Sequence, residues 1–148
     1  MPRNDPHVIY WDASALLSAL FKDRYSDEAQ KWAQQEDSIH LISTLAYTET
    51  YAVIARIQRD GLLADLLIEA ALEILEGGPW HHLNAWPEWK IIRPLSMKWP
   101  LRGADLWHLA TAKTLQKQLP ELFLLTFDSR LNTAALGEGM LTKSSFAS

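Results

Sequence analysis

The first apolar run of the chain is the feature that most constrains its fold. Residues 7–11, His-Val-Ile-Tyr-Trp, are apolar or aromatic at almost every position, and the run stops abruptly at Asp12. Successive side chains of a strand point to opposite faces, so this run would present apolar groups on both sides. Such a pattern is typical of a strand buried between two layers of helices in a parallel sheet.

The rest of the chain alternates short apolar runs with helical patterns. Further strands are predicted at 39–42, 89–93 and 122–127, and helices at 13–21, 26–36, 44–59, 62–75, 103–118 and 129–136. Residues 80–88 are aromatic and irregular, and no repeat or linker divides the 148 residues. The alternation predicts a single α/β domain over residues 1–148, with its core at about residues 7–140 and a short, mainly parallel sheet flanked by helices.

Composition narrows the functions open to such a domain. The chain has no cysteine, which excludes disulfide scaffolds, cysteine-based zinc sites and thiol nucleophiles. Its first residues lack the apolar core of a signal peptide, and its most apolar helical stretch, 62–75, carries three acids and cannot span a bilayer. We therefore expect a cytoplasmic protein that does not associate with membranes.

Two of the predicted strands end in an aspartate. Asp12 follows the first strand and Asp128 follows the fourth. The carboxyl ends of parallel strands share one edge of the sheet, and α/β folds bind their ligands there, so both side chains are expected at that edge. Either aspartate taken alone is equally well explained as a helix N-cap.

Two further acids are predicted on inward-pointing helix faces. The residues three or four positions from Glu49 are Leu45, Ala46, Ala52 and Val53, and those beside Asp105 are Leu101, His108, Leu109 and Ala112. A buried carboxylate costs several kcal/mol unless it is paired, hydrogen-bonded or bound to a metal. The alternatives are an ion pair of Glu49 with Arg56 or Arg59 and, for Asp105, the favourable place of an acid in the first turn of a helix.

Four acids gathered at one edge of a sheet would repel one another. Two carboxylates about 4.5 Å apart repel by roughly 4 kcal/mol at an effective dielectric constant near 20. A hard divalent cation reverses the sign of this interaction, and oxygen ligands suit Mg²⁺ or Mn²⁺. The formal net charge of −4 argues against a protein that coats nucleic acid with Lys and Arg. It leaves open an enzyme that meets phosphates through bound cations.

The sequence contexts of these acids resemble those of a known family. The matching segments are 9–17, 48–49, 101–112 and 125–131. Together they resemble the PIN-domain ribonucleases and, more narrowly, the VapC toxins of type II toxin–antitoxin pairs. The resemblance implies a PIN-like three-layer sandwich and a toxin that hydrolyses RNA phosphodiester bonds with a metal-activated water. The expected products carry 5′-phosphate and 3′-hydroxyl ends.

The resemblance also implies roles for individual residues and partners. Asp12, Glu49, Asp105 and Asp128 would be the catalytic acids that bind Mg²⁺ or Mn²⁺, with Ser14 and Thr126 as supporting hydroxyls. RNA would be the substrate, a VapB-like antitoxin the inhibitor, and a homodimer the assembly. From their place in a basic stretch before Asp105, Arg102 and Lys98 are the candidates for substrate contact.

Several alternatives stay open at this point. The main one is a non-catalytic RNA- or protein-binding module that keeps the PIN fold. An aspartyl-phosphate enzyme built on Asp12 fits less well, because Ser14 stands where a second acid would be needed. His108, one turn after Asp105, is interpreted either as a metal ligand or as a packing or supporting histidine. Trp80, Trp86, Trp89 and Trp99 are interpreted either as packing residues or as exposed platforms for bases or partner helices.

Overall fold

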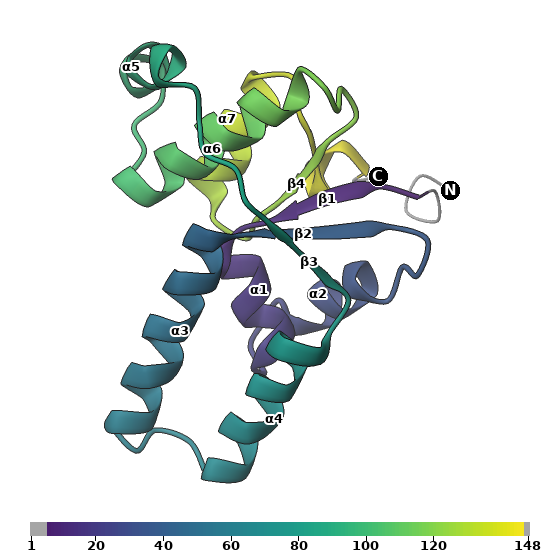
Figure 1. Cartoon of the computed structure of the whole chain (residues 1–148), viewed down its shortest axis with the longest axis vertical. Helices are drawn as coiled ribbons and strands as arrows, with labels where there is room; N and C mark the ends of the chain where they lie inside the picture. The colour runs from purple at the N-terminus through teal and green to yellow at the C-terminus, as the bar shows by residue number, and fades with distance from the viewer. Residues whose placement is uncertain (1–5, 147–148) are drawn as a thin grey trace.

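A five-stranded sheet lies between two layers of helices in the computed structural model, which describes residues 6–146 (Figure 1). The strands are β1 (Val8–Trp11), β2 (Ile39–Ser43), β3 (Trp80–Leu83), β4 (Phe123–Leu125) and β5 (Leu141–Thr142). Their order is β3-β2-β1-β4-β5, and each pair of neighbours is parallel. The predicted three-layer α/β sandwich is confirmed.

The helices divide between the two faces of the sheet (Figure 1). One face packs against α1 (Ala13–Leu20), α2 (Ser26–Ala33), α3 (Thr44–Arg59) and α4 (Asp65–Gly77). The other packs against α5 (Trp89–Lys98), α6 (Gly103–Gln116) and α7 (Ser129–Gly137). None of the helices within residues 6–146 is both long enough and apolar enough to cross a membrane.

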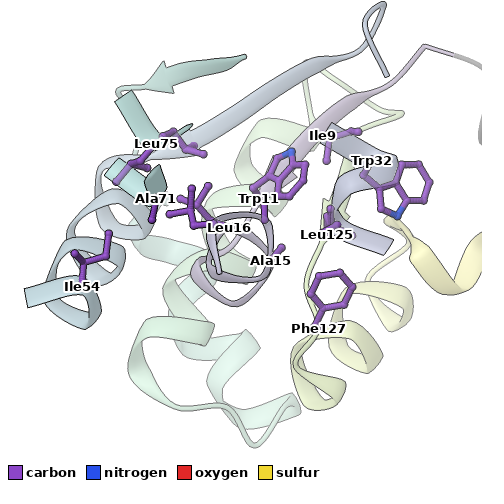
Figure 2. Packing of buried hydrophobic residues seen from close by; sticks show 14 of the residues in the cluster. Ile9, Trp11, Ala15, Leu16, Trp32, Ile54, Ala71, Leu75, Leu125 and Phe127 are labelled. Carbon is purple, nitrogen blue, oxygen red and sulfur yellow. The ribbon is translucent and has the colours of Figure 1, made fainter. Parts of the chain in front are cut away.

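The central strand β1 supplies both halves of the core, as its two-sided pattern predicts. Ile9 and Trp11 belong to the cluster on the α1–α4 side, and Tyr10 belongs to the cluster on the α5–α7 side. Figure 2 shows Trp11 and Trp32 among the aliphatic side chains of the first cluster, where both indoles are fully buried. Aromatic side chains of this size dominate the burial energy of a small core.

The prediction of a strand at 89–93 is wrong. These residues begin α5, whose Ile91, Ile92 and Leu95 pack towards α6 with helical spacing. The third strand is instead β3, in the segment that the sequence pattern left as irregular. Because β3 is an edge strand, its two histidines are exposed, and it lacks the continuous apolar run of a central strand.

The tryptophans fall into two groups. Trp80 packs edge-on against Trp11, with the ring centroids 4.9 Å apart, and the Trp99 indole donates a hydrogen bond to Glu138. Trp86 and Trp89 are exposed, with 66% and 88% of their surface open to solvent. The packing interpretation therefore holds for Trp80 and Trp99 only.

At its C-terminal end the chain adds structure that the pattern did not predict. β5 extends the sheet, and the 3₁₀ helix η2 (Lys143–Phe146) follows it. The Phe146 ring stacks on the Phe123 ring, with the centroids 5.6 Å apart, so the packed core continues past residue 140.

Candidate functional site

The carboxyl ends of β1 and β4 meet at the point where the strand order reverses. The chain winds outwards from β1 through β2 to β3 on one side, and through β4 to β5 on the other. In open α/β sheets the crevice at such a point is where ligands bind. Trp11 and Leu125 are paired in register, so Asp12 and Thr126, which follow them, lie side by side at this crevice.

Asp12 is buried and held in one position by three donors. One carboxylate oxygen, Oδ1, accepts from the Ser14 hydroxyl at 2.7 Å and from the Ala15 backbone N–H at 2.8 Å. The other, Oδ2, accepts from the Thr126 hydroxyl at 2.5 Å. With only 2% of its surface exposed, burial raises the pKa of Asp12 despite these donors. None of the three groups that donate to this carboxylate carries a positive charge. They therefore do not fully offset the cost of burying its ionised form.

Thr126 and Ser14 join the ends of the two strands. The Thr126 hydroxyl donates to Asp12 and accepts from the Asp128 backbone N–H at 3.0 Å. The Ser14 hydroxyl donates to Asp12 and accepts from the Phe127 backbone N–H at 3.0 Å. These two side chains, expected from the sequence as supporting hydroxyls, thus connect the segments that carry Asp12 and Asp128.

Replacing Thr126 by valine should lower the free energy of unfolding by about 1–3 kcal/mol. The change keeps the shape of the fully buried side chain but leaves a carboxylate oxygen of Asp12 and the Asp128 N–H without a partner. Thr126→Ser, which keeps the hydroxyl, is the matched control and should lose less. Urea unfolding of the three proteins measures the difference, and a valine variant as stable as wild type would contradict this account.

Asp128 begins α7 and lies in an open pocket of about 270 Å³. Its Oδ1 accepts from the backbone N–H groups of Arg130 and Leu131 at 2.9 and 3.0 Å, so the residue is an N-cap as well as a candidate ligand. The pocket is lined by Leu101, Arg102, Asp105, Asp128, Ser129 and Arg130. Sequence reasoning missed Arg130, although its place two residues after Asp128 was a signal.

Asp105 experiences the charges of the other acids. Burial raises its pKa, and the negative charges of Asp128 and Glu49 raise it further, whereas His108 and Arg102 act in the opposite direction. Asp105 and Asp128 line one pocket, and Glu49 contacts His108, which lies one turn after Asp105 on α6. The structure therefore brings Asp105, Asp128 and Glu49 to one site.

Glu49 reaches this site from α3, but not as the sequence suggested. The buried face of α3 consists of Ala46, Thr50 and Ile54, so Glu49 lies at its margin, with 32% of its side chain exposed. The prediction that it lies in the middle of the sheet-facing stripe is wrong, because the helix is rotated relative to that expectation. Its carboxylate oxygen Oε1 lies 2.8 Å from Nε2 of His108, which takes the place of the suggested arginine partners.

Both ring nitrogens of His108 are engaged. Nε2 faces Glu49, and Nδ1 lies 2.6 Å from the hydroxyl of Tyr10. The side chain is 1% exposed. A histidine that binds a metal needs one free ring nitrogen, so the structure favours the supporting interpretation of His108 over the metal-ligand one.

The donor set fits a hard divalent cation. Within residues 6–146 no group of three or more His, Asp or Glu side chains lies in an arrangement that could hold a metal ion. Asp105 and Asp128 nevertheless line one pocket, and burial raises the pKa of both Asp12 and Asp105, as expected for carboxylates placed where positive charge is needed. Oxygen ligands without cysteine match Mg²⁺ or Mn²⁺.

Lys98, expected near the substrate, is held elsewhere. Its ammonium group lies 2.9 Å from Glu138, which also contacts Lys113, and Lys98 is not among the residues that line the acidic pocket. A larger cavity of about 370 Å³ lies on the side of the sheet where β1 and β2 begin, between residues such as His7, Ile39 and Leu122. Its lining contains none of the four acids expected to bind metal.

Comparisons with known proteins agree with this architecture. The PIN domain family model matches residues 9–136. Ribonuclease VapC35 from two strains of Mycobacterium tuberculosis, CDC 1551 / Oshkosh and ATCC 25618 / H37Rv, is 30% identical over 132 residues, which covers 86% of this chain and 90% of the relative. The crystal structure of PAE2754 from Pyrobaculum aerophilum superposes with a TM-score of 0.61 over 95% of this chain and 94% of that one, at 17% identity. The chain belongs to the PIN-domain family and, within it, to the VapC-type ribonucleases.

Proposed function

We propose that the protein is an endoribonuclease, the toxin of a toxin–antitoxin pair, and that it hydrolyses RNA with the help of Mg²⁺ or Mn²⁺. The observations that support the metal dependence are the buried Asp12 carboxylate at the junction of β1 and β4 and the Asp105 carboxyl, whose pKa is raised by burial and by the charges of Asp128 and Glu49. This arrangement is unfavourable without a positive charge and favourable with one.

The site residues have different proposed roles in this reaction. Asp12, Glu49, Asp105 and Asp128 would hold the ion, and Ser14 and Thr126 keep the Asp12 carboxylate in one orientation. A bound divalent ion supplies an activated water and neutralises charge on the phosphoryl oxygens. Arg102 and Arg130, which line the same pocket as Asp105, would bind the phosphate that flanks the cleaved bond. Lys98 is the weaker candidate, because it is paired with Glu138.

The proposed partners follow from the same identification. The substrate is RNA, a VapB-like antitoxin inhibits the enzyme, and two copies of the chain form a homodimer in the cytoplasm. The exposed Trp86 and Trp89 leave apolar surface available for such contacts.

The test is cleavage of an RNA pool by purified protein with Mg²⁺, with Mn²⁺ and with EDTA. We expect cleavage only with a divalent ion, and 5′-end sequencing should find 5′-phosphates. Asp105→Asn protein purified in parallel controls for contaminating nucleases. Cleavage that persists in EDTA, fragments with 2′,3′-cyclic phosphate ends, or no cleavage by wild type with either ion would contradict the proposal; the last result would favour a binding module that keeps the fold.

A further inference from the structure

A buried chain of hydrogen bonds ends on Glu49. The Tyr10 hydroxyl, from β1, lies 2.6 Å from Nδ1 of His108 on α6, and Nε2 of the same ring lies 2.8 Å from Oε1 of Glu49 on α3. The two rings meet edge-on, with centroids 5.6 Å apart and planes at 74°. Tyr10 is fully buried and His108 nearly so, whereas Glu49 is partly exposed. Three elements from distant parts of the chain are thus joined by two side-chain contacts.

The chemistry of the groups fixes the direction of donation. A carboxylate only accepts hydrogen bonds, so Nε2 of His108 carries the hydrogen that bonds Glu49. In the neutral ring Nδ1 is then the acceptor, and the Tyr10 hydroxyl donates to it. Tyr10 is also hydrogen-bonded to Ser43, whose oxygen accepts from the Ala46 N–H as the N-cap of α3 and whose hydrogen is free to be donated. The donations therefore run in one direction: Ser43 donates to Tyr10, Tyr10 donates to His108, and His108 donates to Glu49.

Glu49 needs such support more than Asp12 and Asp128 do. Asp12 and Asp128 are short side chains at helix N-caps, where backbone N–H groups hold them. Glu49 lies in the second turn of α3, where backbone N–H groups are already used within the helix, and its longer side chain loses more rotamer freedom when it is fixed. The imidazole of His108 is the rigid, buried donor that reaches its carboxylate.

We infer that His108 is a positioning residue: its Nε2–H holds the Glu49 carboxylate against α6, one turn after Asp105, and the Tyr10 hydroxyl selects the ring tautomer that makes this donation possible. The inference rests on the proposed function in one respect, namely that Glu49 belongs to the group that binds the metal. It assigns to Tyr10 and His108 a role that their burial alone would not indicate, since buried aromatic rings are ordinarily core residues.

The chain contains a matched control. His40 on β2 is also buried, and its Nδ1 also accepts from an aromatic donor, the Trp11 indole N–H, at 3.0 Å. Its Nε2, however, lies 3.3 Å from the backbone carbonyl of Gln35, and neither of these hydrogen bonds reaches one of the four acids. His40→Leu and His108→Leu should therefore both lower thermal stability, and only His108→Leu should disturb the acidic site.

The first experiment compares Mn²⁺ dissociation constants, measured by calorimetry, with thermal unfolding in EDTA. We expect His108→Leu to bind Mn²⁺ about 10–100-fold more weakly than wild type. His108→Gln keeps an N–H near the position of Nε2 and should recover most of that affinity. His40→Leu should bind Mn²⁺ as wild type does, even though its melting temperature falls. Equal affinity of His108→Leu and wild type, or an equal loss in His40→Leu, would overturn the inference.

The second experiment reads the tautomer directly in the metal-free protein. Nitrogen-15 NMR of wild type should show the ring hydrogen of His108 on Nε2 and an accepting Nδ1, and Tyr10→Phe should show a mixture of tautomers together with weaker Mn²⁺ binding. A hydrogen on Nδ1 in wild type, or on both nitrogens, contradicts the inference. If His108→Leu does not fold, these two measurements decide the question.

The outcomes separate the inference from the proposed function. If wild type itself binds neither Mn²⁺ nor Mg²⁺, the proposed function fails and the positioning role fails with it. If wild type binds Mn²⁺ and the His108 and Tyr10 variants bind it equally well, the function stands and only the inference fails.

Discussion

Replacing Asp12 by asparagine should abolish RNA cleavage and at the same time stabilise the metal-free protein. If Asp12 helps to hold the ion, as proposed, its loss should raise the activation free energy by about 4 kcal/mol, which reduces the cleavage rate by about 10³-fold. Asparagine is as good an N-cap as aspartate, so α1 keeps its first turn. The stability gain arises because the buried charge, whose pKa burial raises, is removed.

Cleavage assays and thermal unfolding in EDTA measure the two effects of Asp12→Asn. A gain of about 1 kcal/mol would raise the melting temperature by about 2–4 °C in a protein of this size. The control is Asp37→Asn, at an exposed position away from the site, which should change neither quantity. An asparagine variant that still cleaves RNA at the wild-type rate would remove Asp12 from the mechanism.

The second large effect is a dependence of stability on pH that a divalent ion removes. Burial raises the pKa of Asp12 and Asp105 in the folded protein. When the pKa of a carboxyl group is higher in the folded protein than in the unfolded chain, the protonated group stabilises the fold. This contribution is fully present below the unfolded pKa, near 4, and is lost as the pH rises through the folded pKa. The contribution of these two groups to metal-free stability should therefore decline as the pH rises above about 4.

Saturating Mn²⁺ should reverse that decline. At 100 times its dissociation constant, the ion would add about 2.7 kcal/mol to the free energy of unfolding. The gain should be larger at pH 7.5 than at pH 5, because the ion binds the ionised carboxylates. Urea unfolding at both pH values, with Mn²⁺ or with EDTA, measures it. A gain that is equal at both pH values, or that persists in Asp12→Asn, would contradict the assignment.

Glu138 changes the stability with pH in the opposite sense, so its effect must be separated from that of the acidic site. Although burial opposes the shift, hydrogen bonds from Trp99, Lys98 and Lys113 lower the pKa of Glu138 to about 2. Its contribution is present above the unfolded pKa and is lost as the pH falls towards 2. The difference between wild type and Asp12→Asn at each pH cancels this background, because Glu138 is unchanged in both.

Most of the fold could be predicted from strong local patterns in the sequence. β1 and β4 are central strands buried on both faces, and a run of apolar residues is the direct consequence of that burial. β3 lies at the sheet edge, so its exposed histidines satisfy no such pattern, while the apolar residues at the start of α5 imitate a strand. Edge strands and short helices are where local sequence is least informative, because fewer of their side chains are buried.

The acids were detectable for a related reason. Asp12 and Asp128 interrupt apolar runs, and charge at the end of a buried strand is conspicuous in a sequence. The rotation of α3, which moves Glu49 to the margin of its buried face, was not detectable, because the packing of α3 against α1 and α4 decides which face is covered. Arg130 and Lys98 show the same limit: the first lines the pocket and the second pairs with Glu138.

By itself, the sequence determined the α/β layering and the central strands, and it singled out four acids as candidate ligands, because burial and charge both show in the pattern of consecutive residues. Only the tertiary structure decided that Tyr10, His108 and Glu49 form one chain of hydrogen bonds, with 98 residues separating the first pair and 59 the second. Hydrogen bonds between side chains depend on positions within a few tenths of an ångström. Such positions are set by how the layers pack, and no local pattern encodes them.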